Sequence, residues 1–395
     1  MKVLGIESSC DETAASVVED GERLLSNAVF SSMDLHAVYG GVVPEIAARS
    51  HIESITPVIQ QALDDAQCTW DDIDAIAVTY GAGLGGSLLI GVLTARTLAI
   101  THNKPLYACN HVEGHVYANF LTSTTLPDYV LPTQRPEFPM LSLIVSGGHS
   151  QLVLFRDHFD YSLLGQTQDD AIGEAFDKVA KIIGLPYPGG PSVGKKALEG
   201  DPFAFTFPKA KMPAHRPKHS DAVQGSGEER KEAYTEVRRP STAADDAAMR
   251  AVVESGKYDF SFSGLKTAVL RAAQAEIGQD FTFPSKDLPG RLNEAQKANI
   301  AASFQRTAVE TVVDKAVQAF EEFQPMSVVI AGGVAASPEL RRQLAERIPI
   351  EIRYTDPKLC TDNGAMIATL GCFHMKYKKQ QADPYTLDIA PNLSM

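Results

Sequence analysis

The order of apolar and polar positions along the chain predicts short buried strands that alternate with amphipathic helices. The strands predicted in the first third are residues 3–9, 14–19, 23–31, 73–79 and 105–110. The tight turn at 19–22 joins the second and third of these as a hairpin. From Pro44, apolar residues return at helical spacing, and another apolar helix is predicted at 87–100. Alternation of this kind is typical of an α/β fold.

The opening pattern recurs farther along the chain. Residues 140–145 form an apolar strand, 146–150 a small polar turn and 151–155 a second strand, as in residues 3–19. This repeat predicts a duplicated lobe. Two such lobes facing each other would place both polar turns in one cleft.

Several turns have the composition of ligand-binding turns. The first polar turn, Glu7 to Thr13, contains hydroxyls and carboxylates. It either contacts phosphates, as in actin-like ATPase folds, or is a solvent-facing hairpin loop. In the second, Gly147 and Gly148 leave backbone N–H groups free to meet a phosphate or carboxylate. The Gly-rich turn at 80–87 indicates either an anion site at a helix N-terminus or close backbone packing.

The elements predicted in the rest of the chain are helices at 169–184, 293–323 and 338–347, and strands at 326–330 and 350–354. In the first of these helices, Asp177 either pairs with Lys181 or faces the cleft and binds a ribose hydroxyl. Before the final helix, Thr361 or Asp362 is expected to be the N-cap, and the alternative for Asp362 is a metal ligand.

Residues 209–257 have almost no bulky apolar side chains, so an insertion that is mobile or only partly helical is expected there. Its first section carries the best basic cluster of the chain, which is either a phosphate contact or part of a solvated linker. The cluster consists of Lys209, Lys211, His215, Arg216, Lys218 and His219.

Length and charge narrow the possible functions. A chain of 395 residues is expected to form two domains. The net charge of −13 disfavours nucleic acid as a partner unless a local basic patch or a helper protein contributes. Five scattered cysteines fit a reduced cytoplasm, and neither a signal peptide nor a membrane span is expected.

The pair His111 and His115 is the clearest candidate for metal binding. Residues four apart on a helix lie on the same face, so both rings can reach one ion. The pair would open a helix just after the strand at 105–110, at the end of a strand where α/β sheets bind ligands. Two ordinary histidines, one partly buried and one solvated, are the alternative.

The sequence closely resembles the bacterial tRNA N6-adenosine threonylcarbamoyltransferases (TsaD type, earlier labelled O-sialoglycoprotein endopeptidases). The resemblance covers nearly the whole chain except residues around 118–137 and 209–257. Its motifs, in family order, are GIESSCDET, GGVVPEIAARSH, HVEGH, VSGGHSQL, DDAIGEAFDKVAK, YPGGP, FSFSGLKT, AGGV and CTDNGAM.

The resemblance implies an actin/Hsp70-like (ASKHA) fold of two ribonuclease-H-like lobes with a central cleft. The lobes would be 1–137, with 363–395 packed on it, and 138–362. One divalent metal ion per subunit, Fe2+ or Zn2+, would be held by His111, His115 and Asp362.

The implied activity transfers a threonylcarbamoyl group from threonylcarbamoyl adenylate to the N6 amine of the adenine next to the tRNA anticodon, releasing AMP. The adenylate contacts carried over by position are Ile144, Val145, Ser146, Gly147, Gly148, Asp177, Gly190 and Ser337. Ser337 stands where the family usually has Asn, so that contact is weakened. Asp11 and Glu12 are the candidates for the base. A paralogous partner subunit, a small ATPase and a separate adenylate synthase are implied as well.

Four rival functions are possible. A metalloprotease is disfavoured, because Glu113 lies two residues from each histidine, about 200° round the helix from the metal-binding face. The others are a small-molecule O-carbamoyltransferase, a kinase or ATPase of the same fold, and a non-catalytic ATP-binding scaffold. RNA dependence and a tightly bound transition metal would distinguish these from the tRNA transferase.

Overall fold

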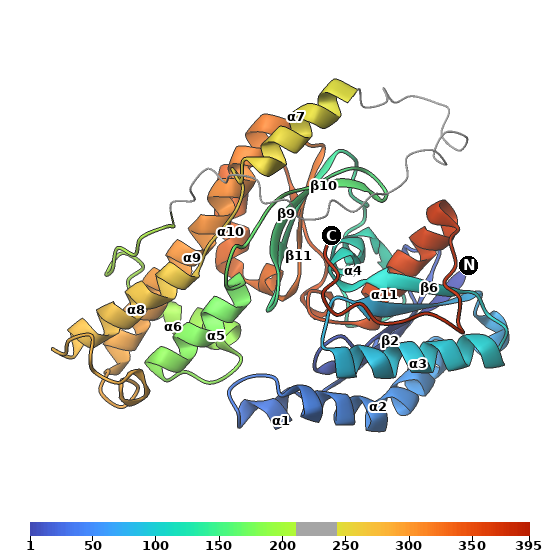
Figure 1. The fold of residues 1–395 in the computed structure, drawn as a ribbon, viewed down its shortest axis with the longest axis horizontal. Coiled ribbons are helices and arrows are strands. Elements are labelled where there is room, and N and C mark those ends of the chain that lie inside the picture. Colours follow the sequence, from blue (N-terminus) through green and yellow to red (C-terminus); the bar gives the residue numbers. More distant parts are fainter. Residues whose placement is uncertain (211–242) are drawn as a thin grey trace.

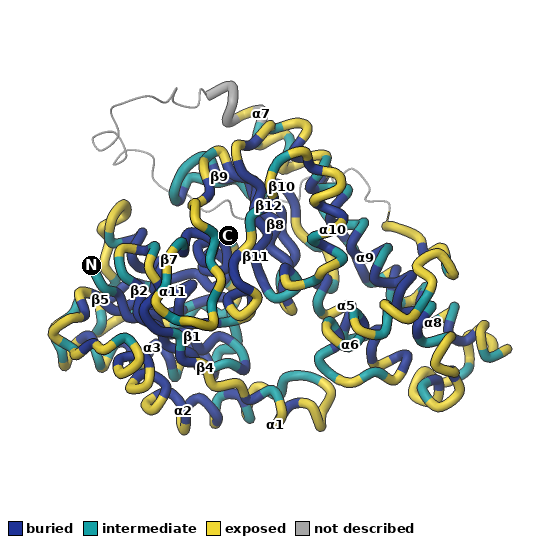
Figure 2. Tube along the Cα trace, turned by 180° about the vertical axis from the view of Figure 1, so that it is seen from behind, coloured by how far each residue is buried: buried dark blue, intermediate teal, exposed yellow. Residues whose placement is uncertain are grey.

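The computed structural model describes residues 1–210 and 243–395, which form two sheets with helices packed around and between them (Figure 1). The strands of both sheets are largely buried, and exposed positions concentrate on the outer helices and loops (Figure 2).

The first sheet is built mainly from the N-terminal part of the chain. Its strands are β1 (Lys2–Glu7), β2 (Glu12–Glu19), β3 (Arg23–Leu24), β4 (Ala28–Ser31), β5 (Ala75–Gly81), β6 (Leu106–Asn110) and β7 (Ser123–Thr124). The order is β6-β5-β1-β2-β3-β7, and β4 also pairs with β2. Strand β2 pairs antiparallel with both β1 and β3, whereas β5 and β6 continue from β1 in parallel.

The second sheet repeats that arrangement. Its strands are β8 (Met140–Val145), β9 (Ser150–Asp157), β10 (Asp160–Gln166), β11 (Ser327–Ala331) and β12 (Ile352–Arg353), in the order β10-β9-β8-β11-β12. Three antiparallel strands are again followed by two parallel ones. This is the ribonuclease-H-like strand order, so the predicted duplication and the predicted α/β class are confirmed.

The helices of the first lobe lie on both faces of its sheet. They are α1 (Met33–Ala37), α2 (Pro44–Asp65), α3 (Gly85–Thr101), α4 (His111–Tyr117) and, from the end of the chain, α11 (Gly364–Phe373). One core joins α2 and α3 to the face that carries Leu4 and Ile6. A second core joins α4 and α11 to the opposite face and to the second sheet, so these two helices lie between the sheets.

The second lobe has its own core against the outer face of its sheet. The helices of this lobe are α5 (Ile172–Ile183), α6 (Gly189–Ala197), α7 (Ala243–Glu254), α8 (Ser263–Glu276), α9 (Glu294–Phe323) and α10 (Pro338–Arg347). Helix α9 begins at the capping box of Asn293 and Gln296. Helix α5 ends at Gly184, whose φ of 76° is readily adopted by glycine.

The end of the chain packs on the first lobe. Helix α11 approaches β1 and β5 so closely that a Cβ on Gly371 would lie 2.4 Å from the Cβ of Ala77. Beyond the helix, Arg96 of α3 donates to the carbonyls of Pro384, Leu387 and Tyr385.

The Gly-rich turn at 80–87 is a site of close backbone packing. A Cβ on Gly81 would lie 2.1 Å from the carbonyl oxygen of Ala390, and one on Gly83 would lie 2.6 Å from that of Ser9. The N–H of Gly83 donates to Pro391, and that of Leu84 to Ser9. Of the two interpretations of this turn, the structure supports close packing.

The predicted N-cap of α11 was wrong, and one of the two alternatives for Asp177 is excluded. The N-cap of α11 is Asn363, whose side chain accepts the N–H of Met366, so neither Thr361 nor Asp362 caps it. Asp177 does not pair with Lys181. Its Oδ1 instead accepts the N–H of Gly189 at 2.6 Å.

The part of the expected insertion that the structure describes is 209–210 and 243–257, which includes α7. In the basic cluster, Lys209 forms ion pairs with Glu310 and Asp314 at 2.9 and 2.7 Å. The other five members, Lys211, His215, Arg216, Lys218 and His219, lie outside the described residues.

Candidate active site and metal centre

The two histidines of the HVEGH segment are placed by the junction of β6 and α4. Strand β6 ends at Asn110, whose side-chain oxygen accepts the N–H groups of Val112 and Glu113 at 2.8 and 3.5 Å. This cap starts the helix at His111, and His115 follows four residues later on the same face.

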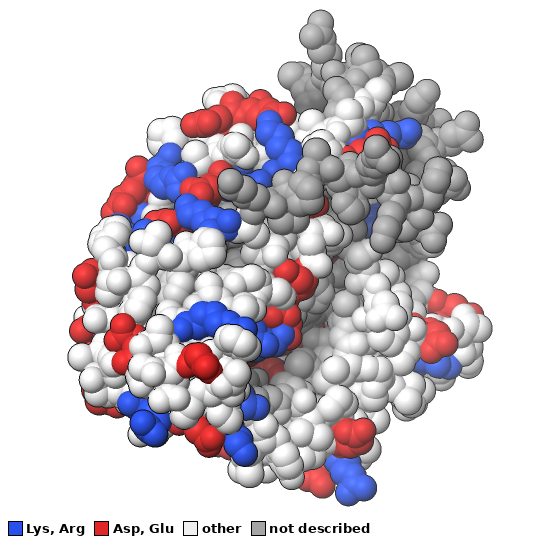
Figure 3. Space-filling model, turned by 60° about the vertical axis from the view of Figure 1, so that its left-hand side comes forward, with Lys and Arg blue, Asp and Glu red and all other residues white. Residues whose placement is uncertain are grey.

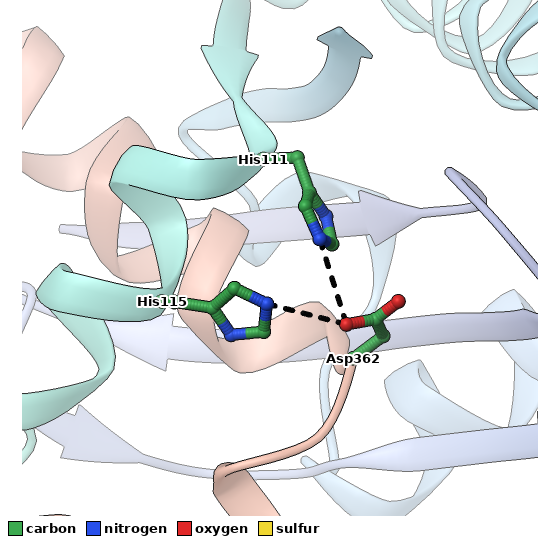
Figure 4. Close-up of side chains that lie close together, drawn as sticks. All are labelled: His111, His115 and Asp362. Atoms are coloured by element: carbon green, nitrogen blue, oxygen red, sulfur yellow. Dashed lines mark ion pairs between the residues drawn. The ribbon is translucent and has the colours of Figure 1, made fainter. Parts of the chain in front are cut away.

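Asp362, in the loop before α11, reaches the same point from the end of the chain (Figure 4). Its Oδ1 lies 3.6 Å from Nε2 of His111 and 3.3 Å from Nε2 of His115. The three ligand atoms lie within 4.8 Å of one another. Because α11 packs against β1, the sheet itself fixes the carboxylate opposite the two rings.

The other nitrogen of His111 contacts a fully buried carboxylate. Glu7, at the end of β1, places Oε2 3.2 Å from Nδ1 of His111. The same carboxylate accepts the hydroxyl of Thr79 and the N–H of Ser9, both at 2.5 Å. Burial opposes the charged form of Glu7, but His111 outweighs it and lowers the pKa of this carboxyl.

This donor set fits a metal ion. Among the described residues, Nδ1 of the buried His115 has no hydrogen-bond partner, and its Nε2 makes only the ion-pair contact with Asp362. Buried polar groups of this kind are costly unless something binds them. Two imidazoles and one carboxylate are common ligands of zinc and iron, and three ligands leave positions open for a substrate. Burial disfavours protonation of His111, but Asp362 and Glu7 raise its pKa to about 9, so a bound ion would displace a proton.

The turn between β8 and β9 faces this centre from the other lobe. The His149 ring lies 6.3 Å from that of His111, and burial together with His111 lowers the pKa of His149 to about 4. Gly147 and Gly148 are exposed, and a Cβ on either would meet nothing within 4 Å. Their backbone is therefore open to a ligand between the lobes.

The remaining predicted contact residues differ in accessibility. Ile144 and Val145 are fully buried in β8, so their side chains cannot contact a ligand between the lobes. A Cβ on Gly190 would meet open space. The preceding residue, Gly189, donates its backbone N–H to the carboxylate of Asp177. Ser337 caps α10 by accepting the N–H of Leu340 at 3.4 Å, which leaves its hydroxyl hydrogen as the one donor it can offer.

Comparison with known proteins matches this arrangement to one family. The sequence profile of the tRNA N6-adenosine threonylcarbamoyltransferases matches residues 23–369. The chain belongs to this family. The threonylcarbamoyltransferase of Thermomicrobium roseum is 44% identical over 408 aligned positions, covering 100% of this chain and 97% of that protein. That of Symbiobacterium thermophilum is 45% identical, covering 94% and 91%.

Among solved structures, the activator of the 2-hydroxyisocaproyl-CoA dehydratase from Clostridium difficile covers 99% of this chain and 100% of its own, with 13% identity and a TM-score of 0.44. A likeness this distant says nothing of the chemistry. Among the helices of residues 1–210 and 243–395, none has both the length and the apolar character of a membrane span.

Glu113, the acidic residue between His111 and His115, is not part of the group that could hold a metal ion. It is 4% exposed, and its Oε1 has no hydrogen-bond partner in the described structure. Burial raises its pKa to about 7, and Lys378 is the charge that opposes this. The position gives no support to a metalloprotease base.

Three residues of the site were missed by the sequence analysis as individual contributors: Glu7, Asn110 and His149. Glu7 carried a usable signal, since a carboxylate directly follows the apolar positions of a predicted buried strand. Asn110 directly precedes the helix predicted from the histidine pair and is a preferred N-cap residue. His149 carried no signal beyond its place in a polar turn.

Proposed function

We propose that this chain transfers a threonylcarbamoyl group from threonylcarbamoyl adenylate to the N6 amine of the adenine next to the tRNA anticodon, releasing AMP, at a metal centre formed by His111, His115 and Asp362. The observation that carries the proposal is the convergence of these three side chains in a member of this family. A divalent ion, iron or zinc, fits the donor set.

In the transfer, the adenine amine attacks the carbamoyl carbon, the new C–N bond forms, and the C–O bond to the adenylate phosphate breaks. When bound, the metal would supply Lewis-acid polarisation of the carbonyl group. The exposed backbone of Gly147 and Gly148 would hold the departing phosphate, and Asp177 and Gly190 would contact the nucleoside. An anticodon-loop adenine is single-stranded and can be turned out into such a site.

The proton released by the amine needs an acceptor, for which Asp11 and Glu12 remain the candidates. Burial, Asp362 and Asp11 raise the pKa of Glu12 to about 9, and a side-chain hydrogen bond to Asp11 adds to this. Glu12 therefore carries a proton at neutral pH. Asp11, which is 8% exposed, is then the proposed acceptor.

A paralogous partner subunit, a small ATPase and a separate adenylate synthase are proposed to act with this chain. The support for a docking partner is the set of exposed apolar side chains around β4, α1 and α2, namely Val29, Phe30, Leu35, Val38, Tyr39 and Ile52. The acidic net charge adds support, because an acidic chain binds the phosphates of tRNA poorly and partner proteins would contribute part of the binding.

The test is a transfer assay with unmodified tRNA, threonine, bicarbonate, ATP, the adenylate synthase and the partner proteins. The tRNA is digested and threonylcarbamoyladenosine is measured by mass spectrometry, together with the metal content of the protein. His111→Ala is compared with the control His102→Ala, whose ring stacks on Trp70 away from the site.

We expect the wild type and the control to form product. We expect His111→Ala to form no product and to bind no metal. Product from His111→Ala would contradict the metal centre. If the metal is bound but no variant forms product, a small-molecule carbamoyltransferase would be the better assignment. If the metal is absent as well, a scaffold would be.

A further inference from the structure

The turn between β1 and β2, which carries Asp11 and leads into Glu12 at the start of β2, is held from inside the first lobe by two histidines. His36 of α1 and His51 of α2 are both fully buried. Neither belongs to the metal cluster, and the proposed chemistry does not use either ring. Each ring is linked to one of two successive backbone carbonyls of the turn, those of Cys10 and Asp11.

His51 binds the first carbonyl directly. Its Nε2 lies 3.0 Å from the oxygen of Cys10, and a carbonyl can only accept, so Nε2 carries a hydrogen and donates it. Burial lowers the pKa of His51, which leaves Nδ1 unprotonated at neutral pH. Nδ1 then accepts the hydroxyl of Thr13 at 2.7 Å.

His36 reaches the second carbonyl through a serine. Its Nδ1 accepts the N–H of Val43 at 3.2 Å, so Nε2 is the donor to the hydroxyl of Ser32 at 3.1 Å. The Ser32 hydroxyl donates in turn to the carbonyl of Asp11 at 2.8 Å, and the Ser32 N–H donates to the same oxygen at 3.1 Å. Every donor in this series of hydrogen bonds, from His36 through Ser32 to Asp11, has a defined acceptor.

Fixing two successive carbonyls fixes the peptide planes on both sides of Asp11, because each plane rotates only about φ and ψ. We propose that His36 and His51 are positioning residues that hold the Asp11–Glu12 turn in the orientation needed for transfer. This inference rests on the proposed function, in which that turn supplies the proton acceptor.

The size of the effect is limited by a second donor to the same carbonyl. Ser87 of α3 donates its hydroxyl to Cys10 at 3.1 Å, so the carbonyl stays partly held without His51. We therefore expect roughly a tenfold loss of kcat rather than inactivation.

The experiment compares His51→Leu with His51→Gln, whose amide can restore the donor to Cys10. The control is His102→Leu, at a ring outside this network. Transfer is measured as kcat and as KM for tRNA. The second readout is alkylation of Cys10 by iodoacetamide in the folded protein, quantified by peptide mass spectrometry.

Cys10 is a suitable probe of the turn because the other four cysteines are buried and shielded from the reagent. In the wild type its thiol is expected to react slowly, since burial and Asp11 raise its pKa. In His51→Leu we expect alkylation to be faster by about tenfold and kcat to be lower, with KM for tRNA unchanged. His51→Gln should restore the wild-type alkylation rate and the wild-type kcat. A general loss of packing would not be reversed by the amide of Gln.

Unchanged alkylation of Cys10 in His51→Leu would overturn the inference, and so would faster alkylation with an unchanged kcat. If His51→Leu does not fold, Ser32→Ala removes the link from His36 to Asp11 and is judged by the same two readouts. If the wild type forms no product, the proposed function fails, whereas the alkylation rates still decide whether the histidines hold the turn.

Discussion

At the scale of single residues, Glu7 is the buried carboxylate that contacts His111 through Nδ1, whereas Nε2 of the same ring faces Asp362 in the proposed metal centre. Its carboxylate contacts Nδ1 of His111, and a partner of this kind orients a ligand ring and raises its basicity. Glu7→Gln keeps the size but removes the charge. We expect zinc affinity to fall by about 10–100-fold, measured by competition with a chromogenic chelator.

The control for this prediction is Glu113→Gln, a change of the same kind at a residue equally shielded from solvent. Glu113 lies on α4 between the two proposed ligands but outside the candidate metal cluster. Its zinc affinity is expected to stay within about threefold of the wild type, because only groups contacting the ligands tune the site. Equal losses in the two variants would mean that any buried charge near α4 matters.

His374 allows a prediction about pH and stability. It is 8% exposed, and burial, reinforced by Lys378, lowers its pKa to about 3. The unfolded histidine takes up a proton near pH 6.5, whereas the folded one stays neutral until about pH 3. Its contribution to stability is therefore complete above pH 6.5 and is lost as the pH falls from 6.5 toward 3.

His374→Leu removes this proton uptake. Between pH 6 and 4, the free energy of unfolding of the variant should fall less steeply than that of the wild type, by up to about 1.4 kcal/mol per pH unit. Urea titrations across this range measure the slope. His158, whose pKa burial also lowers to about 3, still gives the variant some pH dependence. If the free energy of unfolding falls equally steeply with pH in the variant and the wild type, the lowered pKa of His374 is refuted.

The residues that sequence reasoning identified are those whose spacing carries information. His111 and His115 stand four apart, and Gly147 and Gly148 strip side chains from a turn. From its place before the final helix, Asp362 could only be given as one of two N-cap candidates or as a metal ligand, because its contact with the two histidines spans about 250 residues of chain. The family resemblance favoured the metal ligand. The role of Asn363 was assigned wrongly to its neighbours, because Thr, Asp and Asn are all good caps.

At the scale of elements, the contact of α11 with the first sheet fixes Asp362. Gly371 faces Ala77 of β5 at a distance that excludes a methyl group. Gly371→Ala is expected to destabilise the protein by about 1–3 kcal/mol through overpacking. Since α11 would shift, zinc affinity should fall as well. Thermal unfolding and the chelator competition test both effects.

Gly264→Ala is the matched control in another helix. A Cβ at this position of α8 would meet nothing within 4 Å. Replacing an unstrained helical glycine reduces the entropy of the unfolded chain, so a gain of about 0.4–1 kcal/mol is expected. A loss of stability as large as that of Gly371→Ala would show that helix propensity, rather than the close contact, decides the outcome.

Elements with a clear apolar period were predictable, and those without one were not. The apolar stripe of α5 and the continuous apolar residues of β8 were recognisable from the sequence. Strand β10 was missed because it is only partly buried, so its residues lack a continuous apolar run. The close packing of the turn at 80–87 depends on residues near the end of the chain, which local sequence cannot reveal.

At the scale of the whole molecule, the charge distribution bears on how tRNA is held. On the face shown in Figure 3, Lys and Arg side chains are interspersed with Asp and Glu and do not form one basic surface. With a net charge of −13, the chain has to bind phosphates through a few local residues or through its partners. The basic cluster at 209–219 is the local candidate.

Lys209 pairs with Glu310 and Asp314, so its charge is already balanced, whereas Lys211, Arg216 and Lys218 lie outside the described residues. We expect the triple change Lys211→Ser, Arg216→Ser and Lys218→Ser to weaken tRNA binding. The salt dependence of the binding constant should become shallower, by about 0.7–0.9 in log–log slope for each phosphate that the variant no longer neutralises. Filter binding at several salt concentrations measures both.

Lys209→Ser is the control, because its ammonium group is neutralised by two carboxylates and should add nothing to the salt slope. If the triple variant keeps the affinity and slope of the wild type, tRNA is held elsewhere, and the same measurement with the partner subunits present shows whether they supply the positive charge. If Lys209→Ser reduces the slope as much as the triple variant, its ion pairs open when tRNA binds. In that case Glu310 and Asp314 compete with the phosphates for this lysine.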